Sequence, residues 1–329
     1  MSSRNTVRFA LAAVLGFAVA SPAAAATKWV MASGYPEASF FTKNLRMFIE
    51  EIETATNGEL TIDLRPNGEL IKLDAIKRSV QSGQIPIGEI RFGVYGNEDP
   101  MFTLDSVPEI AGNYDAAWRL MEAQAPYFDK VLGEAGIAVL AYEAWPGQGF
   151  YTKFEVESAD QFDGVKLRIY SEATQRMGEL LGFQATILPF AEVPQAFSTG
   201  LIDAMFTSAQ TGNDVQAWDF IDHFTYTGTM HNKNGIIVNK RALAKLDPAV
   251  RDAVVAAGEN ATRRAWELSK EASEITLENL RKAGMKVAEA SPALQARLDE
   301  VGAEMVKEWS AKATPEQQAV IDAYLKSAD

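Results

Sequence analysis

The chain has 329 residues, of which 47% are hydrophobic and 23% are charged, so it can bury a large core and is long enough for two lobes. Its 31 Lys and Arg residues are outnumbered by 44 Asp and Glu residues, which gives a net charge of -13. This charge would repel a phosphate backbone and argues against nucleic acid as a partner, so any bound anion must be held by locally placed cations.

The N-terminus has the features of an export signal. Arg4 and Arg8 precede an uncharged apolar run at 9–19, and the following SPAAAAT has the small residues that suit a signal peptidase. We expect 1–26 to be a signal peptide cleaved after about Ala26, and the lack of an Arg-Arg pair favours the general export route. No later window reaches the roughly 20 apolar residues of a membrane span. With no cysteine for disulfides, thiolate ligands or lipid attachment, a freely diffusing periplasmic protein is expected.

Strand patterns alternate with helical patterns along the rest of the chain, as in α/β proteins. Strands are predicted at 28–33 and 60–66, with apolar residues at helical spacing over 41–52 between them and Asn57-Gly58 as the helix stop. Further strands are predicted at 85–93, 136–143, 164–170, 201–207 and 235–240.

The C-terminal part of the sequence predicts helices. One helical pattern runs from Glu259 to Ala283 and is longer than a single lobe needs. Ser291-Pro292 and Thr314-Pro315 each have the form of an N-cap followed by proline at the first helical position, and Gln317 completes a capping box with Thr314. No repeat or glycine-serine linker occurs, so a second lobe would have to be joined by strands that cross over.

The search for catalytic and metal-binding motifs is negative. His223 and His231 are the only histidines, and there is neither an HExxH arrangement nor a thiolate to complete a zinc site. GxSxG, Walker and GxGxxG motifs are also absent. Carboxylates are plentiful, but the sequence alone cannot pair them. We therefore expect a protein that is not an enzyme and that has no metal and no cofactor.

The stretch DGVKLRIYSE, 163–172, contains the most informative cation. Val165, Leu167 and Ile169 alternate with Lys166, Arg168 and Tyr170, so a strand here would bury one face and turn the Arg168 guanidinium to the other. That guanidinium faces either bulk water or a binding site, and the alternation does not decide between them.

Four segments of the sequence resemble a known family, and this resemblance indicates where the Arg168 guanidinium points. They are GYPEASFFTKNLRMFIEEIETATNGELTIDLRPNGEL, VQSGQIPIGEIRFG, DQFDGVKLRIY and LPFAEVPQAFSTGLIDAMFT, at 34–70, 80–93, 160–170 and 188–207. The chain resembles the substrate-binding protein of a tripartite ATP-independent periplasmic (TRAP) transporter of the DctP type. The resemblance covers nearly the whole mature chain, and its specific part is the GVKLR strand followed by PF.EV...F.TG.IDA.

The resemblance implies a two-lobed α/β periplasmic binding protein fold, with a ligand cleft between the lobes and a long helix that spans both. Lobe I would comprise 27–146 with about 234–275, and lobe II would comprise 147–233 with about 276–329.

The resemblance also implies roles for individual residues. Arg168 would point into the cleft and hold the ligand's carboxylate through two parallel hydrogen bonds, a geometry that a guanidinium offers. Phe190 would pack against the ligand, with an ordinary core position as the alternative. Asp203 matches a shared aspartate and is expected to be structural, at the end of a strand.

Two residues differ from the sialic-acid-binding members of the family, and both bear on which ligand is bound. Thr207 stands where those members have an asparagine, and Arg91, counted from Gly83, stands where they have a glutamate. A cation in place of an anion argues against a polyhydroxylated sugar acid.

Other residues are expected at the cleft by position. Trp145 and Gln148 occur near the crossover, where related proteins often have a second basic residue, and Tyr35 follows the first strand, although a surface turn would explain it equally well. With Phe206 and Trp145 as further apolar walls, the site suggests a small organic acid: a dicarboxylate, a sulfonate, or an aromatic or branched carboxylate.

The function implied is that of a periplasmic solute-binding protein. It would close on its ligand and deliver it, as a monomer, to the small and large membrane subunits of a TRAP permease, driven by an ion gradient. Two other classes remain open. An ABC-type or sensor-coupled binding protein would share the two-lobed design, and a secreted hydrolase would need a catalytic group that the sequence does not display.

Overall fold

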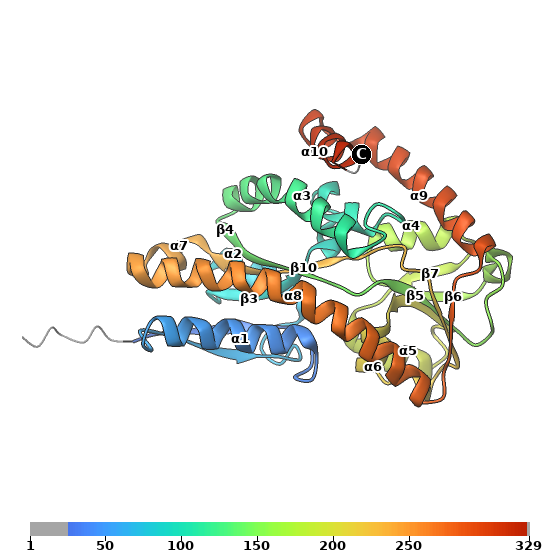
Figure 1. Ribbon diagram of the computed structural model, residues 1–329, viewed down its shortest axis with the longest axis horizontal. Coiled ribbons are helices and arrows are strands. Elements are labelled where there is room, and N and C mark those ends of the chain that lie inside the picture. Colours follow the sequence, from blue (N-terminus) through green and yellow to red (C-terminus); the bar gives the residue numbers. More distant parts are fainter. Residues whose placement is uncertain (1–25, 328–329) are drawn as a thin grey trace, which may run out of the picture.

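The computed structural model describes residues 26–327 and contains two sheets (Figure 1). The first sheet has the strand order β2-β1-β3-β10-β4. Its strands are β1 (Thr27–Ala32), β2 (Leu60–Arg65), β3 (Ile87–Arg91), β4 (Ile137–Ala144) and β10 (Lys233–Asn239). β1 pairs in parallel with β2 and β3, whereas β10 pairs antiparallel with β3 and β4. The chain therefore returns to lobe I through β10 after building all but one strand of the second sheet.

The second sheet belongs to lobe II and has the order β11-β9-β5-β8-β6-β7. Its strands are β5 (Gln148–Thr152), β6 (Lys166–Ile169), β7 (Gln184–Ile187), β8 (Ala204–Ser208), β9 (His223–Tyr226) and β11 (Lys286–Glu289). β6 lies between β7 and β8 and is parallel to both. The strand that contains Arg168 is therefore internal to its sheet.

Helices cover both sheets. Lobe I has α1 (Phe40–Ala55), α2 (Leu73–Ser82) and α3 (Tyr114–Glu134), while lobe II has α4 (Glu172–Leu180), α5 (Val193–Ser198) and α6 (Ala209–Asp214). α7 (Lys240–Ala244) is short. The described part of the chain also has the 3-10 turns η1 (Phe92–Tyr95), η2 (Pro100–Ser106), η3 (Ala159–Phe162), η4 (Phe190–Glu192) and η5 (Ala217–Asp219). α1 ends where Asn57 and Gly58 take positive φ values of 49° and 78°, as its stop signal predicts.

Helix α8 (Pro248–Lys282) spans the two lobes (Figure 1). Val250, Val254 and Ala261 near its start are buried in the core of lobe I, and Leu280 near its end is buried in the core of lobe II. Its 35 residues correspond to about 50 Å at 1.5 Å per residue. The predicted two-lobed α/β fold with a lobe-spanning helix is confirmed.

The C-terminal helices cross back over the molecule. α9 (Pro292–Lys312) contacts α4 of lobe II, where Glu308 pairs with Arg176 at 2.6 Å. α10 (Pro315–Lys326) packs on α3 of lobe I, with Ile321 and Tyr324 buried. The lobe boundaries stay a prediction, with one correction: because the apolar face of α10 is buried against α3, the end of the chain lies on lobe I and not on lobe II.

The N-terminal caps of these two helices are as the sequence predicts. Ser291 Oγ accepts a hydrogen bond from Leu294 N, and Thr314 and Gln317 form the capping box. No helix within 26–327 combines the length and the apolar character needed to cross a membrane. The predicted signal peptide, 1–26, lies almost entirely outside the described residues.

Candidate ligand cleft between the lobes

A cleft of about 320 Å³ lies between the two lobes. Lobe I contributes Tyr35, Leu73, Asp74, Arg91, Val94, Asn97 and Trp145, and lobe II contributes Gln148, Arg168, Tyr170, Ser171, Glu172, Ile187, Leu188, Pro189, Phe190, Thr207 and Thr211. Rings from the two lobes meet across it, since the centroids of Tyr35 and Phe190 are 6.0 Å apart. The volume suits a small ligand, because binding pockets of small molecules begin near roughly 300 Å³.

Arg168 enters the cleft from β6. Its neighbours Leu167 and Ile169 point to the opposite face and are fully buried, as the alternation predicts. Arg168 itself is 3% exposed, and its Nε donates a hydrogen bond to the Leu188 carbonyl at 3.1 Å. Burial, followed by repulsion from Arg91, lowers the pKa of Arg168 to about 9, so it remains a cation at neutral pH. Among the described residues, 26–327, the only hydrogen bond of the Arg168 side chain is that of Nε, which leaves Nη1 and Nη2 for a ligand.

Arg91 enters the same cleft from the end of β3. It is 8% exposed, and its guanidinium carbon lies 3.8 Å from the centre of the Tyr170 ring, which Arg168 approaches at 5.6 Å. Within residues 26–327, neither arginine forms an ion pair, and Arg91 Nη2 has no hydrogen-bond partner. Asp74 and Glu172 also line the cleft. Two buried guanidiniums without a paired carboxylate make this a site for an anion.

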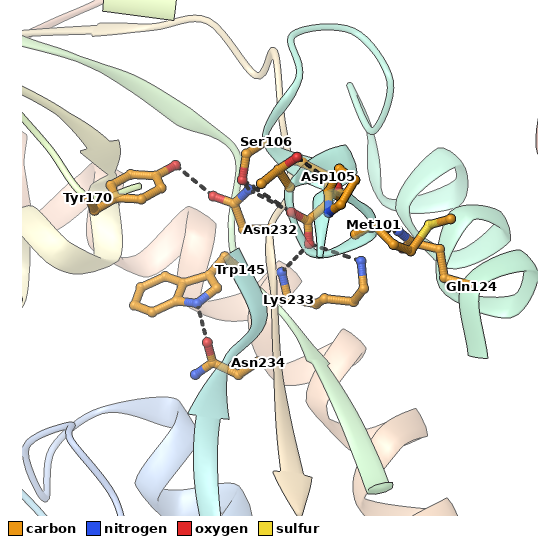
Figure 2. A network of polar contacts seen from close by, with 11 residues as sticks. Met101, Asp105, Ser106, Gln124, Trp145, Tyr170, Asn232, Lys233 and Asn234 are labelled. Carbon is orange, nitrogen blue, oxygen red and sulfur yellow. Dashed lines mark hydrogen bonds and ion pairs between the residues drawn. The ribbon is translucent and has the colours of Figure 1, made fainter. Parts of the chain in front are cut away.

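Tyr170 is hydrogen-bonded to the segments that connect the lobes (Figure 2). Its hydroxyl donates to Asn232 Oδ1 at 2.6 Å, and Asn232 Nδ2 donates to the Asp105 carbonyl at 2.9 Å. Asp105 is paired with Lys233 at 2.9 Å, and both side chains are buried. The Tyr170 ring, which both guanidiniums approach, is therefore fixed by a polar network at the crossover.

Aromatic and polar side chains complete the cleft. Trp145 donates its Nε1 hydrogen bond to Asn234 Oδ1 at 2.8 Å, which turns the indole toward β10 (Figure 2). Gln148 is buried, donates to the Pro146 carbonyl and accepts from the Tyr170 hydroxyl at 3.3 Å. The site thus offers apolar walls together with a few fixed polar groups.

Most of the residues singled out in the sequence meet in this cleft. The structure places Tyr35, Arg91, Trp145, Gln148, Arg168, Phe190 and Thr207 along its lining. Phe206 differs from the prediction. Because neighbouring residues of β8 point to opposite faces, Phe206 turns away from Thr207 and packs on Phe150 at 4.8 Å in the core. Asp203 pairs with Lys153 at 2.8 Å just before β8, which fits the expected structural role.

Several lining residues were not singled out in the sequence. Tyr170 had a signal, because it shares a strand face with Arg168 two residues earlier. Asp74, Asn97 and Glu172 lie at a helix start or in a turn, and no local pattern marks them as cleft residues.

The histidines do not form a metal site within 26–327, where no cluster of three His, Asp or Glu side chains with metal-binding geometry occurs. His231 is buried, 3.1 Å from the Trp145 carbonyl through Nδ1, and packs on the Tyr114 ring. Burial lowers the pKa of His231 to about 4, so it is neutral at neutral pH.

The architecture and the cleft agree with a known family. Residues 31–312 match the model of the bacterial extracellular solute-binding proteins, family 7, named DctP. The chain belongs to this family. As a family 7 protein it is a TRAP solute-binding protein, which confirms the prediction made from the sequence motifs.

Three relatives of this family 7 protein are informative. The solved structure of DctP7 from Bordetella pertussis, an extracytoplasmic solute receptor binding pyroglutamic acid, is 39% identical with a TM-score of 0.89, covering 91% of this chain and 99% of that one. A TRAP solute-binding protein specific for pyroglutamate from a marine metagenome is 33% identical with a TM-score of 0.88, covering 92% and 99%. The C4-dicarboxylate-binding periplasmic protein DctP of Rhodobacter capsulatus is 28% identical over 261 residues, 74% of each chain.

Proposed function

We propose that this family 7 protein binds a small cyclic monocarboxylate, with pyroglutamate as the reference ligand. The observation that carries the proposal is the pair of buried guanidiniums, Arg91 and Arg168, without an ion pair in a closed cleft of about 320 Å³. The two relatives at 39% and 33% identity, both described as pyroglutamate binders, support the same ligand class.

The geometry suggests how such a ligand would lie. Arg168 Nη1 and Nη2 would donate two parallel hydrogen bonds to the carboxylate, because Nε is already engaged by Leu188. The flat ring would pack against Phe190 and Trp145, and the lactam N–H and C=O would meet polar groups such as Gln148 and Thr207.

The proposed cellular role follows from the family. The protein would be exported through its signal peptide, 1–26, bind its ligand in the periplasm as a monomer, and present the closed form to the small and large subunits of a TRAP permease. The start of β1 at Thr27, directly after the expected cleavage point, fits this proposal. The ligand would be released unchanged, without chemical turnover.

A C4-dicarboxylate is the second candidate. The second guanidinium, Arg91, favours it, because two separated cations suit two carboxylates. The Rhodobacter capsulatus relative, described as a C4-dicarboxylate binder, is less similar than the two pyroglutamate binders.

Titration calorimetry with pyroglutamate, L-proline and succinate tests the proposal. Proline has the same ring and carboxylate, but its ammonium would face two guanidiniums, so we expect pyroglutamate to bind at least about tenfold more tightly, equivalent to about 1.4 kcal/mol. Tighter binding of succinate would instead establish the dicarboxylate function. Binding of neither acid would reject both, and mass spectrometry of the co-purifying compound would then name the ligand class. Chemical conversion of pyroglutamate during incubation, followed by NMR, would contradict a pure binding role.

A further inference from the structure

A pair of buried glutamates lies behind the aromatic wall of the cleft. We infer that Glu89 and Glu143 share one proton, held by Glu143, and that this pair acts as a set of positioning residues for Trp145 and Tyr35. The inference rests on the proposed function in one respect, namely that the cleft is the ligand site.

The two carboxyl groups lie on strands β3 and β4 and are both 0% exposed. Glu89 accepts hydrogen bonds from Ser33 Oγ at 2.5 Å and from Asn234 Nδ2 at 2.9 Å. Glu143 Oε1 accepts from Asn44 Nδ2 at 2.7 Å. The two glutamates lie on the strands that flank β10, Glu143 Oε2 has no donor among the described residues, and the remaining contact of each carboxyl group is with the other. Such a contact requires a proton, because two carboxylate oxygens are both acceptors.

Arg264, on the side of the pair away from the cleft, fixes the orientation of the Asn44 amide that contacts Glu143. The Arg264 guanidinium on α8 can only donate, and its Nε lies 2.8 Å from Asn44 Oδ1. The Asn44 amide oxygen therefore faces Arg264, and its nitrogen must face Glu143. Glu143 Oε1 is thereby an acceptor.

A second donor-only group fixes the inner end, at the cleft (Figure 2). The Trp145 indole can only donate, and its Nε1 lies 2.8 Å from Asn234 Oδ1, which the Tyr35 hydroxyl also reaches at 3.4 Å. The Asn234 nitrogen must therefore face Glu89. Asn44 and Asn234 therefore both donate toward the glutamates, and a single proton between the two carboxyl groups completes the hydrogen-bond network.

The location of that proton follows from the contacts. Glu89 already accepts from Ser33 and Asn234, which stabilises its charged form, whereas Glu143 Oε2 faces no donor within the described part of the chain. Burial raises the pKa of both groups, and the charge of Glu89 raises that of Glu143 further.

One charged group near the pair opposes the protonation of Glu143 but is outweighed by burial. Arg264 on α8 lowers the pKa of Glu143 to a smaller extent than burial raises it, and Arg91 on β3 and the hydroxyl of Tyr35 lie on the cleft side. Glu143 is therefore the proton donor and Glu89 the single anion.

Two consequences concern ligand binding. The ionised Glu89 holds the Asn234 amide in the orientation that presents its oxygen to Trp145 and Tyr35, so both rings keep their places in the wall. The proton on Glu143 also leaves one negative charge, not two, behind a cleft that contains two guanidiniums, which keeps the cleft net cationic.

Two isosteric substitutions test the proton assignment with opposite expected results. In Glu143→Gln the amide oxygen still accepts from Asn44 and its nitrogen donates to Glu89, so pyroglutamate should bind within about threefold of wild type. In Glu89→Gln an amide nitrogen replaces one of the oxygens that accept from Ser33 and Asn234, so Ser33 or Asn234 must reorient or Glu143 must ionise, and the affinity should fall at least about tenfold. Glu134→Gln, at an exposed position on α3, is the matched control for loss of one charge.

Ligand-free measurements separate this inference from the proposed function. Infrared difference spectra should show that wild type has a protonated-carboxyl contribution beyond that of Asp214, which Glu143→Gln lacks and Glu134→Gln retains. A group with a raised pKa in the folded state loses its stabilising contribution as pH rises, so the melting temperature of Glu143→Gln should fall less between pH 5 and pH 9 than that of wild type. Asp214, whose pKa burial raises to about 7, is present in both proteins. Glu89, whose pKa burial also raises to about 7, titrates in the same range, so the difference between the two melting profiles reports the glutamate pair as a unit.

Measurements on Glu143→Gln can overturn the inference. An unchanged protonated-carboxyl band, or a pH profile of melting identical to that of wild type, would show that Glu143 does not hold the proton. Equal affinities of the two glutamine variants would show that the pair does not position the wall. If wild type does not bind pyroglutamate, the proposed ligand is wrong, and the infrared and melting measurements still decide the proton.

Discussion

The Arg168 guanidinium is held in the interior without an acidic partner in the described residues, which is an unfavourable state for a folded protein on its own. A buried charge without a counter-ion destabilises the fold, as the pKa of Arg168, lowered to about 9 by burial, also indicates. Such a group is kept where function needs it, because the fixed Nε contact with Leu188 orients the remaining nitrogens before a ligand arrives. Part of the binding free energy then comes from giving this cation its partner.

Substitution of Arg168 should separate binding from folding. Arg168→Ala would leave the ligand's carboxylate unpaired in a closed cleft, at a cost of roughly 3–5 kcal/mol, which is about two to four decades in Kd. Arg168→Lys keeps the charge but loses the planar fork, so its affinity should be intermediate. Titration calorimetry measures both, and ligand-free melts should show that neither variant unfolds, because Leu167 and Ile169 are untouched. Wild-type affinity in Arg168→Ala would disprove the carboxylate contact.

Substitution of Arg91 should report the charge of the ligand. If Arg91 contacts a second acidic group, Arg91→Ala should weaken succinate far more than pyroglutamate, because only the dianion loses a second ion pair. If it acts only through its stack on Tyr170, both ligands should lose affinity equally. Calorimetry with the two acids distinguishes the cases, and equal losses would remove Arg91 from any direct contact with a second carboxylate.

The sequence predicts single residues of the site when a local pattern marks them. Arg168 is marked by strand alternation and by its motif, and Phe190 by the motif that follows. Phe206 was placed wrongly because the motif gives its position along β8 but not the face of the sheet to which it points. Neighbouring residues of a strand point to opposite faces, so Phe206 and Thr207 cannot both face the cleft. The Glu89 and Glu143 pair could not be predicted, because its chemistry depends on two strands that are joined only through β10.

A buried ion pair between Asp105 and Lys233 joins η2 to the start of β10, the strand that returns from lobe II to lobe I. Asp105 at the end of η2 accepts from Lys233 N at 3.1 Å and from Nζ at 2.9 Å, where β10 begins. Both side chains are nearly inaccessible to solvent. The contact fixes η2 against the strand that returns from lobe II to lobe I, so it bears on stability rather than on ligand contact.

Breaking this pair should destabilise the fold strongly. Asp105→Asn keeps the shape but leaves a buried ammonium uncompensated, at a cost of about 3–5 kcal/mol in the free energy of unfolding. The exposed pair of Lys130 and Glu316, at 2.7 Å, is a matched control, and Glu316→Gln should cost about 0–1 kcal/mol. Denaturant unfolding measures both. Similar losses in the two variants would contradict the role of burial, and adding Lys233→Met to Asp105→Asn should recover part of the loss.

The elements were predicted unevenly: the 21-residue helix α3 was not predicted, whereas the four-residue strand β6 was. The helix at α8 was recognised, but its start was placed at Glu259 and not at Pro248, although Asp247-Pro248 is the same kind of start signal as Ser291-Pro292. Strands β7, β9 and β11 have four residues each and were not predicted, because their pairing partners define them more than their own pattern does. Topology likewise depends on long-range pairing.

The whole molecule adopts a closed form in this structure. Tyr35 of lobe I meets Phe190 of lobe II at 6.0 Å, and Arg168 is only 3% exposed. A ligand with a carboxylate cannot reach so buried a group without separation of the lobes. Binding and release therefore require an open form, and the ligand shifts the balance between the two forms by the contacts it makes only when the cleft is closed.

Solution scattering should detect this closure. The two guanidiniums repel each other and are costly to bury without an anion, so the ligand-free protein should populate the open form and have a larger radius of gyration. Saturating pyroglutamate, or the acid that calorimetry identifies, should reduce the radius, because the anion offsets both charges and joins the lobes. Arg168→Ala, measured with and without the same ligand, is the control: because it should not bind, its two curves should be identical. Identical curves for wild type with and without a ligand that calorimetry shows to bind would mean that the cleft does not open by movement of the lobes.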